Sequence, residues 1–305
     1  MIHHTERVLK QKTKIVKHTH LKLEKNSLIR KLINTILVPI LNNLPIKSRG
    51  LIKKSNKAVS DIVDNATNHK ALEILYHNGY KKDLKKIYEK ISNRVWLNTN
   101  NSKAVRNRLK VVNHEISNYL KYLLASHKEE ISIVSIAAGS ARAVIEALEA
   151  NSTTNKKISV TFIDKSEDAL TYSKELLVTK DFYNLPNYTF TWINDTVNGF
   201  LDKNTTKFDI VEMVGLMDYF DDDRARTIFT KIYNTLNRDG IFVTANINHN
   251  SEKRFVTKAI GWLMIYRSAE HIGRLVHEAG FPHADIEVYY EPLKIHSIII
   301  ARRTS

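Results

Sequence analysis

The sequence lacks cysteine entirely, and its 305 residues include only 9 glycines and 5 prolines. The absence of cysteine excludes disulfide bonds, thiolate metal sites and a cysteine nucleophile. The sequence has no glycine-rich phosphate loop ending in Lys-Ser or Lys-Thr, and no serine elbow of the hydrolase type. The histidines are scattered without the spacing of metal ligands, so we expect no metal site.

Long apolar runs are also missing. Residues 1–17 are basic and have no apolar centre of the kind found in signal peptides. The most apolar stretch, residues 28–46, is interrupted by charged residues, asparagines and a proline, which is not typical of a membrane span. With 43% hydrophobic and 26% charged residues, the composition is that of a globular protein, and we expect a cytoplasmic one.

Charge is distributed unevenly along the chain. Residues 1–110 contain 25 Lys and Arg against 7 Asp and Glu, a net charge of +18, whereas residues 111–305 contain 22 against 25, a net charge of −3. A basic region can attract nucleic acid, anionic lipid or an acidic carrier, or its lysines can simply face solvent. This shift predicts a basic N-terminal region over residues 1–110 and a second domain over residues 111–305.

The N-terminal region has the periodicity of helices. Asn26-Ser27 can cap a helix whose apolar face recurs between Leu28 and Leu41. A second helix is expected over residues 69–77, ending at Gly79. A third is expected after Asn101-Ser102, because apolar residues then recur at steps of three and four as far as Leu123. The region can therefore act as a lid or as a binding region for substrate or partner.

From residue 131 onward, apolar strands alternate with helices. We expect strands at residues 131–136, 158–163, 188–193, 208–214, 240–246, 284–290 and 294–301. Regular alternation predicts right-handed crossovers and a parallel sheet covered on both faces. The last two strands are separated by four residues only, which predicts an antiparallel hairpin. The expected fold is therefore α/β, with a seven-stranded, mostly parallel Rossmann-like sheet, an antiparallel last strand and an all-helical region before it.

Small and acidic residues follow the first three strands. The first strand runs into Ala137-Ala-Gly-Ser140, the second ends at Asp164, and the third is followed by Asn194-Asp195. Ligands of open α/β sheets bind outside the carboxyl ends of the strands, where backbone meets one end of a nucleoside and a carboxylate accepts its ribose hydroxyls. This order predicts a nucleoside site. Each acidic residue could instead close a strand or cap a turn, and Ser140 could cap the next helix.

The order of elements, together with Gly215-Leu-Met-Asp-Tyr219 and Leu236-Asn-Arg-Asp-Gly-Ile-Phe, resembles the class I S-adenosylmethionine-dependent methyltransferases over residues 110–303. The first turn has fewer glycines than is usual there. The resemblance implies S-adenosylmethionine as cofactor, with Asp164 on the ribose hydroxyls and Asp195 near the adenine amino group. It implies a cofactor site made of Ala137, Ala138, Gly139, Ser140, Asp164, Asn194, Asp195, Val214 and Gly215.

A later Trp262-x-x-x-Tyr266-Arg267 narrows the resemblance to a bacterial subgroup that includes enzymes methylating the carboxyl of 3-hydroxy fatty acids. This implies a small anionic acceptor, and the candidate catalytic residues are Asp218, Tyr219, Tyr266 and Arg267. An arginine fork can hold a carboxylate in two hydrogen bonds, and a tyrosine hydroxyl can orient it. A carboxylate acceptor needs no general base, whereas a hydroxyl or amine would need one, such as Asp218.

Structural roles are equally open to these residues. Asp218 could cap the helix that begins near residue 222, and Tyr266 could pack in the core while Arg267 pairs with an acid. Glu212, alone among apolar neighbours in its strand, could face the cofactor or be a paired buried acid.

Three functions follow from these patterns. The first is O-methylation, at a carboxyl or hydroxyl, of a small acceptor such as a fatty acid or an acyl group on an acidic carrier. The second is RNA methylation with residues 1–110 as the nucleic-acid grip, although aromatic residues for base stacking are few there. The third is a non-catalytic binding protein that contacts a membrane surface through the helix of residues 28–41.

Overall fold

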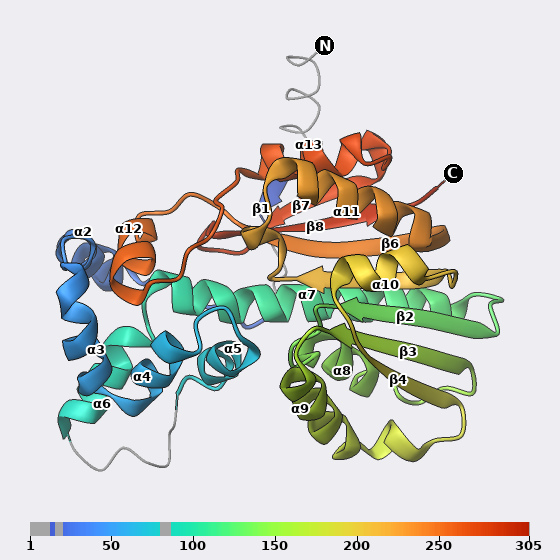
Figure 1. Cartoon of the computed structure of the whole chain (residues 1–305), viewed down its shortest axis with the longest axis horizontal. Helices are drawn as coiled ribbons and strands as arrows, with labels where there is room; N and C mark the ends of the chain where they lie inside the picture. Colours follow the sequence, from blue (N-terminus) through green and yellow to red (C-terminus); the bar gives the residue numbers. More distant parts are fainter. Residues whose placement is uncertain (1–12, 16–20, 80–86, 305) are drawn as a thin grey trace.

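The computed structural model describes residues 13–15, 21–79 and 87–304. Its centre is one eight-stranded sheet, in the spatial order β1-β7-β8-β6-β5-β2-β3-β4 (Figure 1). The strands are β1 (Thr13–Ile15), β2 (Glu130–Ile136), β3 (Lys157–Asp164), β4 (Tyr188–Asn194), β5 (Phe208–Val214), β6 (Leu236–Ile247), β7 (Ile286–Tyr290) and β8 (His296–Arg302). Each strand that the sequence predicts is present, and β6 begins four residues earlier than expected.

Strands β2 to β6 are parallel to one another, whereas β8 is antiparallel to both β6 and β7. The expected hairpin between the last two strands is therefore confirmed, and with it the seven-stranded sheet of the expected fold class. The register pairs Asp164 with Asn194 at the ends of β3 and β4. The strand tips that carry the candidate residues consequently meet at one edge of the sheet.

One prediction about the N-terminal region is wrong. Residues Thr13–Ile15 form β1, which adds to the edge of the sheet in parallel with β7, so the region is not all helical. Three residues are too short to show the alternating pattern of a strand in sequence. The strand depends on the exposed edge of β7, which the sequence of residues 1–20 does not reveal.

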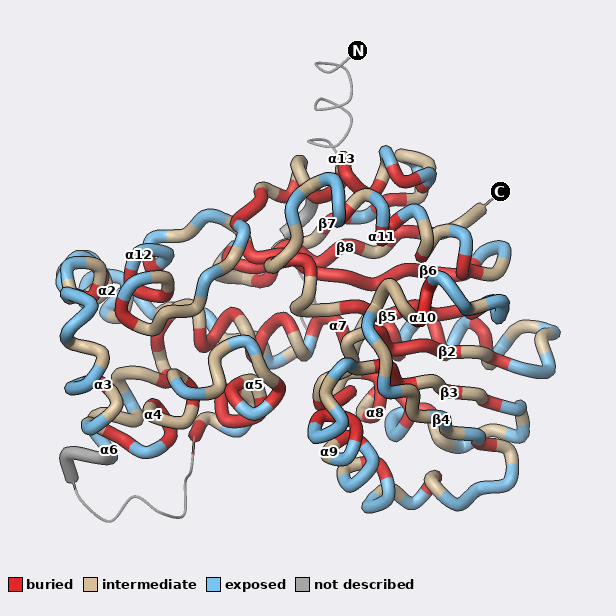
Figure 2. Tube along the Cα trace, viewed as in Figure 1, coloured by how far each residue is buried: buried red, intermediate tan, exposed pale blue. Residues whose placement is uncertain are grey.

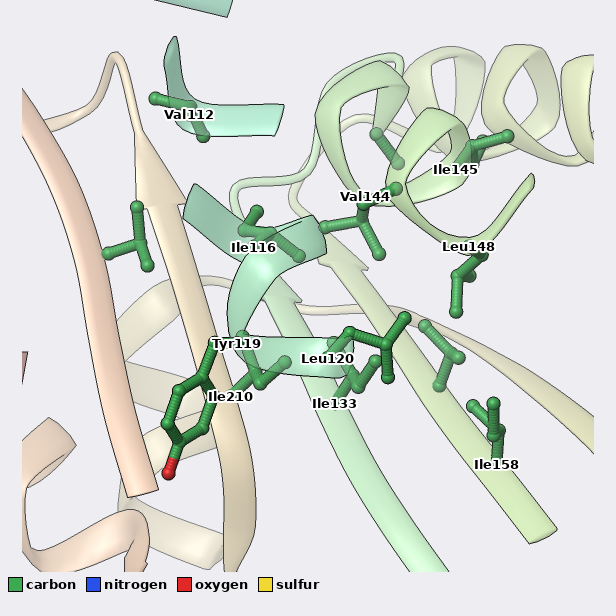
Figure 3. Packing of buried hydrophobic residues seen from close by; sticks show 14 of the residues in the cluster. Val112, Ile116, Tyr119, Leu120, Ile133, Val144, Ile145, Leu148, Ile158 and Ile210 are labelled. Atoms are coloured by element: carbon green, nitrogen blue, oxygen red, sulfur yellow. The ribbon is translucent and has the colours of Figure 1, made fainter. Parts of the chain in front are cut away.

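Helices cover both faces of the sheet. On one face lie α7 (Asn100–Ala125), α8 (Arg142–Glu149) and α9 (Glu167–Val178), and on the other lie α10 (Val197–Lys203), α11 (Asp222–Thr235) and α13 (Ala269–Glu278). Figure 3 shows the first of these cores, where Ile116 and Leu120 of α7 point toward strand residues such as Ile133. Burying these large side chains, at about 1.5–3 kcal/mol each, holds the strand tips in fixed positions.

The remaining helices form a second body beside the sheet (Figure 1). Ser27 caps α2 and Gly79 follows α5 in the left-handed conformation, as expected. We call this second body the helical body. Its elements are α2 (Leu28–Asn42), the 3-10 turn η1 (Ile46–Ser48), α3 (Arg49–Ser55), α4 (Lys57–Asp64), α5 (His69–Tyr76) and α6 (Ile87–Trp96), joined by α12 (Lys253–Phe255) and the π-helical turn η4 (Val256–Ile260).

Helix α7 connects the two bodies. It begins at Asn100, capped by Thr99, and continues for 26 residues, so residues 110 and 111 lie in its interior. Its first turns contact α5, and its later turns contact α8, β6 and β8. The division that the charge pattern predicts at residue 110 therefore falls inside one continuous helix. The helical body is positioned against the strand tips by this helix.

Candidate functional site

The first turn is held in an unusual backbone conformation. Ala137, Gly139 and Ala141 all have positive φ, between 52° and 54°, in the left-handed region that glycine tolerates and alanine disfavours. The Ala138 amide donates to Ile163 O at 2.9 Å, which ties the turn to β3. Ser140 does not cap α8: the N-cap position is Ala141, which has no side-chain oxygen, so that expectation is wrong. We call residues 137–141 the cofactor turn.

Asp164 lies against the cofactor turn. One carboxylate oxygen accepts a hydrogen bond from the Gly139 amide at 2.9 Å, and the other accepts one from the Ser166 amide at 2.9 Å. Each oxygen keeps a second lone-pair site, and the side chain is only half-buried. The carboxylate can therefore still accept the two hydroxyls of a ribose.

The pair after β4 is arranged differently. Asn194 is exposed and donates to Asp164 O at 3.1 Å, which joins the tips of β3 and β4. Asp195 accepts from the Thr196 amide at 2.7 Å and pairs with Lys203 at 3.2 Å. The Thr196 amide, followed by Lys203, lowers the pKa of Asp195. Asp195 is thus tied to the start and end of α10, and Asn194 is the more open of the two side chains.

Helix α5 of the helical body closes over the cofactor turn. Glu73 accepts hydrogen bonds from Arg142 Nε at 3.0 Å and from the Tyr172 hydroxyl at 2.9 Å, and Lys70 pairs with Asp168 at 2.8 Å. Glu73 is buried, and its partners Arg142, Ser140 and Tyr172 lower its pKa against the opposing effect of burial. The contacts fix the helical body over the strand tips that precede α8 and α9.

The opposite side of the strand tips is formed by β5 and α7. Gly215 follows β5 and has φ +90°, and Val214 precedes it as the half-buried last residue of the strand. A β-carbon built on Gly215 would lie 3.7 Å from the guanidinium of Arg108, so this arginine reaches the tip of β5. Arg108 is 4% exposed, and no described residue accepts a hydrogen bond from its Nε.

A largely apolar cavity of about 120 Å³ begins at this point and extends into the helical body. Arg108, Gly215, Asp218 and Tyr219 line it on the side of the strand tips. The rest of its wall comes from α4 to α7, η4 and the segment after it, and includes Ile62, Leu75, Val105, Val256, Trp262 and Met264. We call this space the acceptor cavity. It places one buried cation at the end of an apolar chamber.

Tyr219 and His296 also line the acceptor cavity. The Trp262 indole donates to the Tyr219 hydroxyl at 2.6 Å, which leaves the hydroxyl proton of Tyr219 free to be donated elsewhere. Burial raises the pKa of Tyr219 to about 12, so this proton is retained at neutral pH. His296 is buried, and neither ring nitrogen has a hydrogen-bond partner among the described residues. Burial holds its pKa well below the usual range, so the ring is neutral.

Two buried carboxyls neighbour Arg108. Burial raises the pKa of Asp218 to about 6 and that of Glu212 to about 7, and in both cases the Arg108 charge opposes the rise. Asp218 accepts from the Ile247 amide at 2.7 Å, whereas Asp221 caps α11, so the capping role considered for Asp218 is wrong. Glu212 accepts from the Ser135 hydroxyl at 2.5 Å. Both carboxyls therefore change charge close to neutral pH.

Neither Tyr266 nor Arg267 lines the acceptor cavity. All polar contacts of Arg267 are to the fold itself: Asp222 at 2.8 Å, Asn246 Oδ1 and Met217 O at 2.9 Å, and Phe220 O. It is 1% exposed. Tyr266 packs beside His249 and under the Lys253 ammonium. The geometry therefore favours a structural role for both residues. For Arg267 it is the alternative given above, in which the arginine pairs with an acid.

Arg108 is the residue that sequence reasoning missed. It lies three residues after Val105 and four before Val112, which puts a charge on the apolar stripe of α7. A charged residue on a core-facing stripe is rarely buried unless it is paired or functional. His296 carried no comparable signal, because a histidine that begins a strand is common.

The residues present fit S-adenosylmethionine, the cofactor that the resemblance implies. The cofactor turn is half-exposed at its small residues, Asp164 keeps two acceptor sites, and Gly215 leaves room at the next strand tip. When bound, the cofactor would meet backbone at the turn, Asp164 at its ribose, and Val214 and Gly215 beside its reactive end. Within residues 13–15, 21–79 and 87–304, we find no group of three or more side chains that could hold a metal ion.

Comparisons with known proteins agree with this geometry. Residues 64–303 match the model of the family described as "Putative methyltransferase". No curated protein matches the chain. A solved structure described as a "possible exported protein" from Bordetella parapertussis is 13% identical with a TM-score of 0.63, covering 92% of this chain and 100% of that one. The CurJ carbon methyltransferase is also 13% identical, with a TM-score of 0.51, covering 81% of this chain and 67% of that one.

At these identities the solved structures show the fold alone, whereas the family model covers most of the chain. The sheet order and the antiparallel β8 are those of the class I fold. The chain therefore belongs to this family of methyltransferases and is an enzyme of class I, the S-adenosylmethionine-dependent kind.

Proposed function

We propose that the enzyme methylates the carboxylate of a small acid with an apolar chain, a fatty-acid-like acceptor. The observation that carries this proposal is the acceptor cavity, an apolar chamber with Arg108 buried at the end nearest the cofactor turn. An apolar chain is stabilised by such a wall, and a carboxylate is stabilised by the guanidinium. A cofactor site and an acceptor site thus meet at Gly215.

In this arrangement the acceptor carboxylate lies between Arg108 and Tyr219. The guanidinium attracts the negative charge strongly because the surrounding wall excludes water. The Tyr219 hydroxyl, oriented by Trp262, supplies a hydrogen bond to the same group. When bound, S-adenosylmethionine supplies an electrophilic methyl group: the S–CH3 bond breaks as the O–CH3 bond forms, and the charges of sulfonium and carboxylate are both lost.

The chain's own residues then provide position rather than proton transfer. A carboxylate is ionised at neutral pH, so no side chain needs to remove a proton from it. Asp218 lies in the same cavity and would become the base if the acceptor were a hydroxyl. With a pKa of about 6, Asp218 can be charged or neutral near neutral pH. Removing its charge should therefore stop methylation of a hydroxyl and leave methylation of a carboxylate almost unchanged.

The test offers saturated and 3-hydroxy fatty acids of graded chain length, the matching alcohols and amides, and total RNA to the full-length enzyme with methyl-labelled S-adenosylmethionine. We expect methyl esters of the acids and no labelled amide, alcohol or RNA. Asp218→Asn should keep ester formation within about threefold, because Asn retains an oxygen for the Ile247 amide. Labelled RNA, or a labelled methyl ether formed from a hydroxyl, would contradict the proposal. So would loss of all methyl transfer in Asp218→Asn with cofactor binding intact.

A further inference from the structure

Helix α2 has two apolar sides, and only one of them is buried. Val38 and Leu41 pack with Ile52, Phe255 and Val256 against the helical body. The expected apolar face points elsewhere: Leu28, Ile29, Leu32, Ile33, Ile36 and Ile40 are 46–78% exposed. Figure 2 shows this exposed helix at the outer end of the helical body. A helix that is apolar on nearly all sides is normally buried, so this exposed face indicates a partner.

The exposed face is continuous with the segment that follows it. Ile46 of η1 and Leu51 of α3 are 67% and 72% exposed. The positions 28, 32, 36 and 40 recur every four residues, which draws them into one stripe along the helix. We call the exposed apolar residues of α2, η1 and α3 the α2 surface.

The segment that carries the α2 surface is basic. Residues 25–60 contain eight Lys and Arg and no Asp or Glu. Lys25, Lys31, Lys47 and Lys54 are exposed. Lys53 of α3 pairs with Asp64 of α4 at 2.5 Å, and the exposed lysines leave the surroundings net positive. Apolar side chains flanked mainly by cations complement a bilayer with anionic headgroups: the acyl chains contact the apolar side chains, and the phosphates attract the cations.

We propose that the α2 surface docks the enzyme on an anionic lipid bilayer, with α2 lying in the plane of the interface. Its 15 residues span about 22 Å, a length that suits an interfacial helix. No helix in the described part of the chain is both long and apolar enough to span a bilayer. Attachment at the surface needs no such span.

The docked orientation places the acceptor cavity close to the lipid. The inner side of α2 packs on Phe255 and Val256, and both residues also line the cavity. An amphiphilic acid dissolved in the bilayer would thus lie one helix layer from the cavity wall. The docking proposal rests on the α2 surface alone, so it holds or fails independently of the proposed methyl acceptor.

Flotation of the full-length protein with vesicles tests the docking. The vesicles are phosphatidylcholine alone or phosphatidylcholine mixed with phosphatidylglycerol, at low and high salt. We expect binding to the mixed vesicles that weakens with salt, and a loss of at least about tenfold in the variant Leu32→Glu/Ile36→Glu. The matched control, Val178→Glu/Leu185→Glu, changes two exposed apolar residues outside the α2 surface and should bind as the unchanged protein does.

Sedimentation in the absence of lipid distinguishes docking from self-association. If α2 instead joined two copies of the chain, the unchanged protein would be a dimer, Leu32→Glu/Ile36→Glu would be a monomer, and vesicles would not float the protein. That result, equal binding to neutral vesicles, or unchanged binding by Leu32→Glu/Ile36→Glu would each overturn the proposal. Cofactor binding by the variants, measured calorimetrically, confirms that they are folded.

Discussion

The cofactor turn and the acceptor cavity lie on two sides of the same strand tips, but they differ in how their polar groups are satisfied. Around the cofactor turn, the charges are paired: buried Glu73 with Arg142, and half-buried Asp164 with backbone amides. In the acceptor cavity, Arg108 has an unpartnered Nε and His296 has two unpartnered ring nitrogens among the described residues. Paired groups stabilise a shape, whereas unsatisfied buried groups cost stability and are kept where a ligand uses them.

The largest expected effect comes from removing the cation of the acceptor cavity. Arg108→Met should lower kcat/KM for a fatty acid by about 100-fold or more, because a buried carboxylate then loses its charge partner. Binding of S-adenosylmethionine should change by less than about threefold. Arg106→Met is the control: it removes a neighbouring buried arginine that pairs with Glu24 and does not line the cavity. Equal losses of kcat/KM in both variants would show that Arg108 acts through the fold rather than on the acceptor.

The next largest effect is expected at the cofactor turn. Asp164→Asn keeps the shape but loses the charge that would accept two ribose hydroxyls, so the Kd for S-adenosylmethionine should rise about 10- to 30-fold by calorimetry. The KM for the acid should stay nearly constant at saturating cofactor. As a control, Asp195→Asn should have a smaller effect on that Kd, since Asp195 is held by Thr196 and Lys203. A larger rise of this Kd in Asp195→Asn than in Asp164→Asn would place the cofactor nearer β4.

The difference between the two sides also explains what the sequence can reveal. Strand tips in a parallel sheet are brought together by topology, so the sequence predicts that Gly139 and Asp164 meet, and the hydrogen bond between them confirms this. That they bind the cofactor stays a prediction. The acceptor cavity is assembled from α4 to α7, η4 and the ends of β5, β6 and β8, which are far apart in the chain, and no local pattern encodes their meeting. Arg267 misled for the same reason: its partner Asp222 and the carbonyls around it come from another segment.

Glu212, a buried carboxyl in β5, gives a smaller, pH-dependent effect on stability. Burial raises the pKa of Glu212 from 4.5 to about 7, so the folded protein binds a proton that the unfolded chain releases. The contribution of Glu212 to stability therefore falls as pH rises from 4.5 through 7, and this loss is complete above the folded-state pKa. Glu212→Gln removes the titration and should raise the free energy of unfolding by roughly 1–2 kcal/mol at pH 8 but not at pH 4.5. Denaturant titrations at the two pH values measure it, and an equal gain at both would mean that Glu212 is not the titrating group.

The smallest effect concerns the backbone of the cofactor turn. Ala141 has φ 52°, a conformation that costs an alanine about 1–2 kcal/mol and a glycine almost nothing. Because glycine also loses more backbone entropy on folding, Ala141→Gly should raise the free energy of unfolding by only about 0.5–1 kcal/mol. Ala147→Gly is the control, since it lies buried inside α8 and should lower the same quantity by about 1–2 kcal/mol through helix propensity and the loss of a buried methyl group. If Ala141→Gly also destabilised the protein, the left-handed turn would not be its resting conformation, and the contrast between a fixed cofactor turn and an open acceptor cavity would fail.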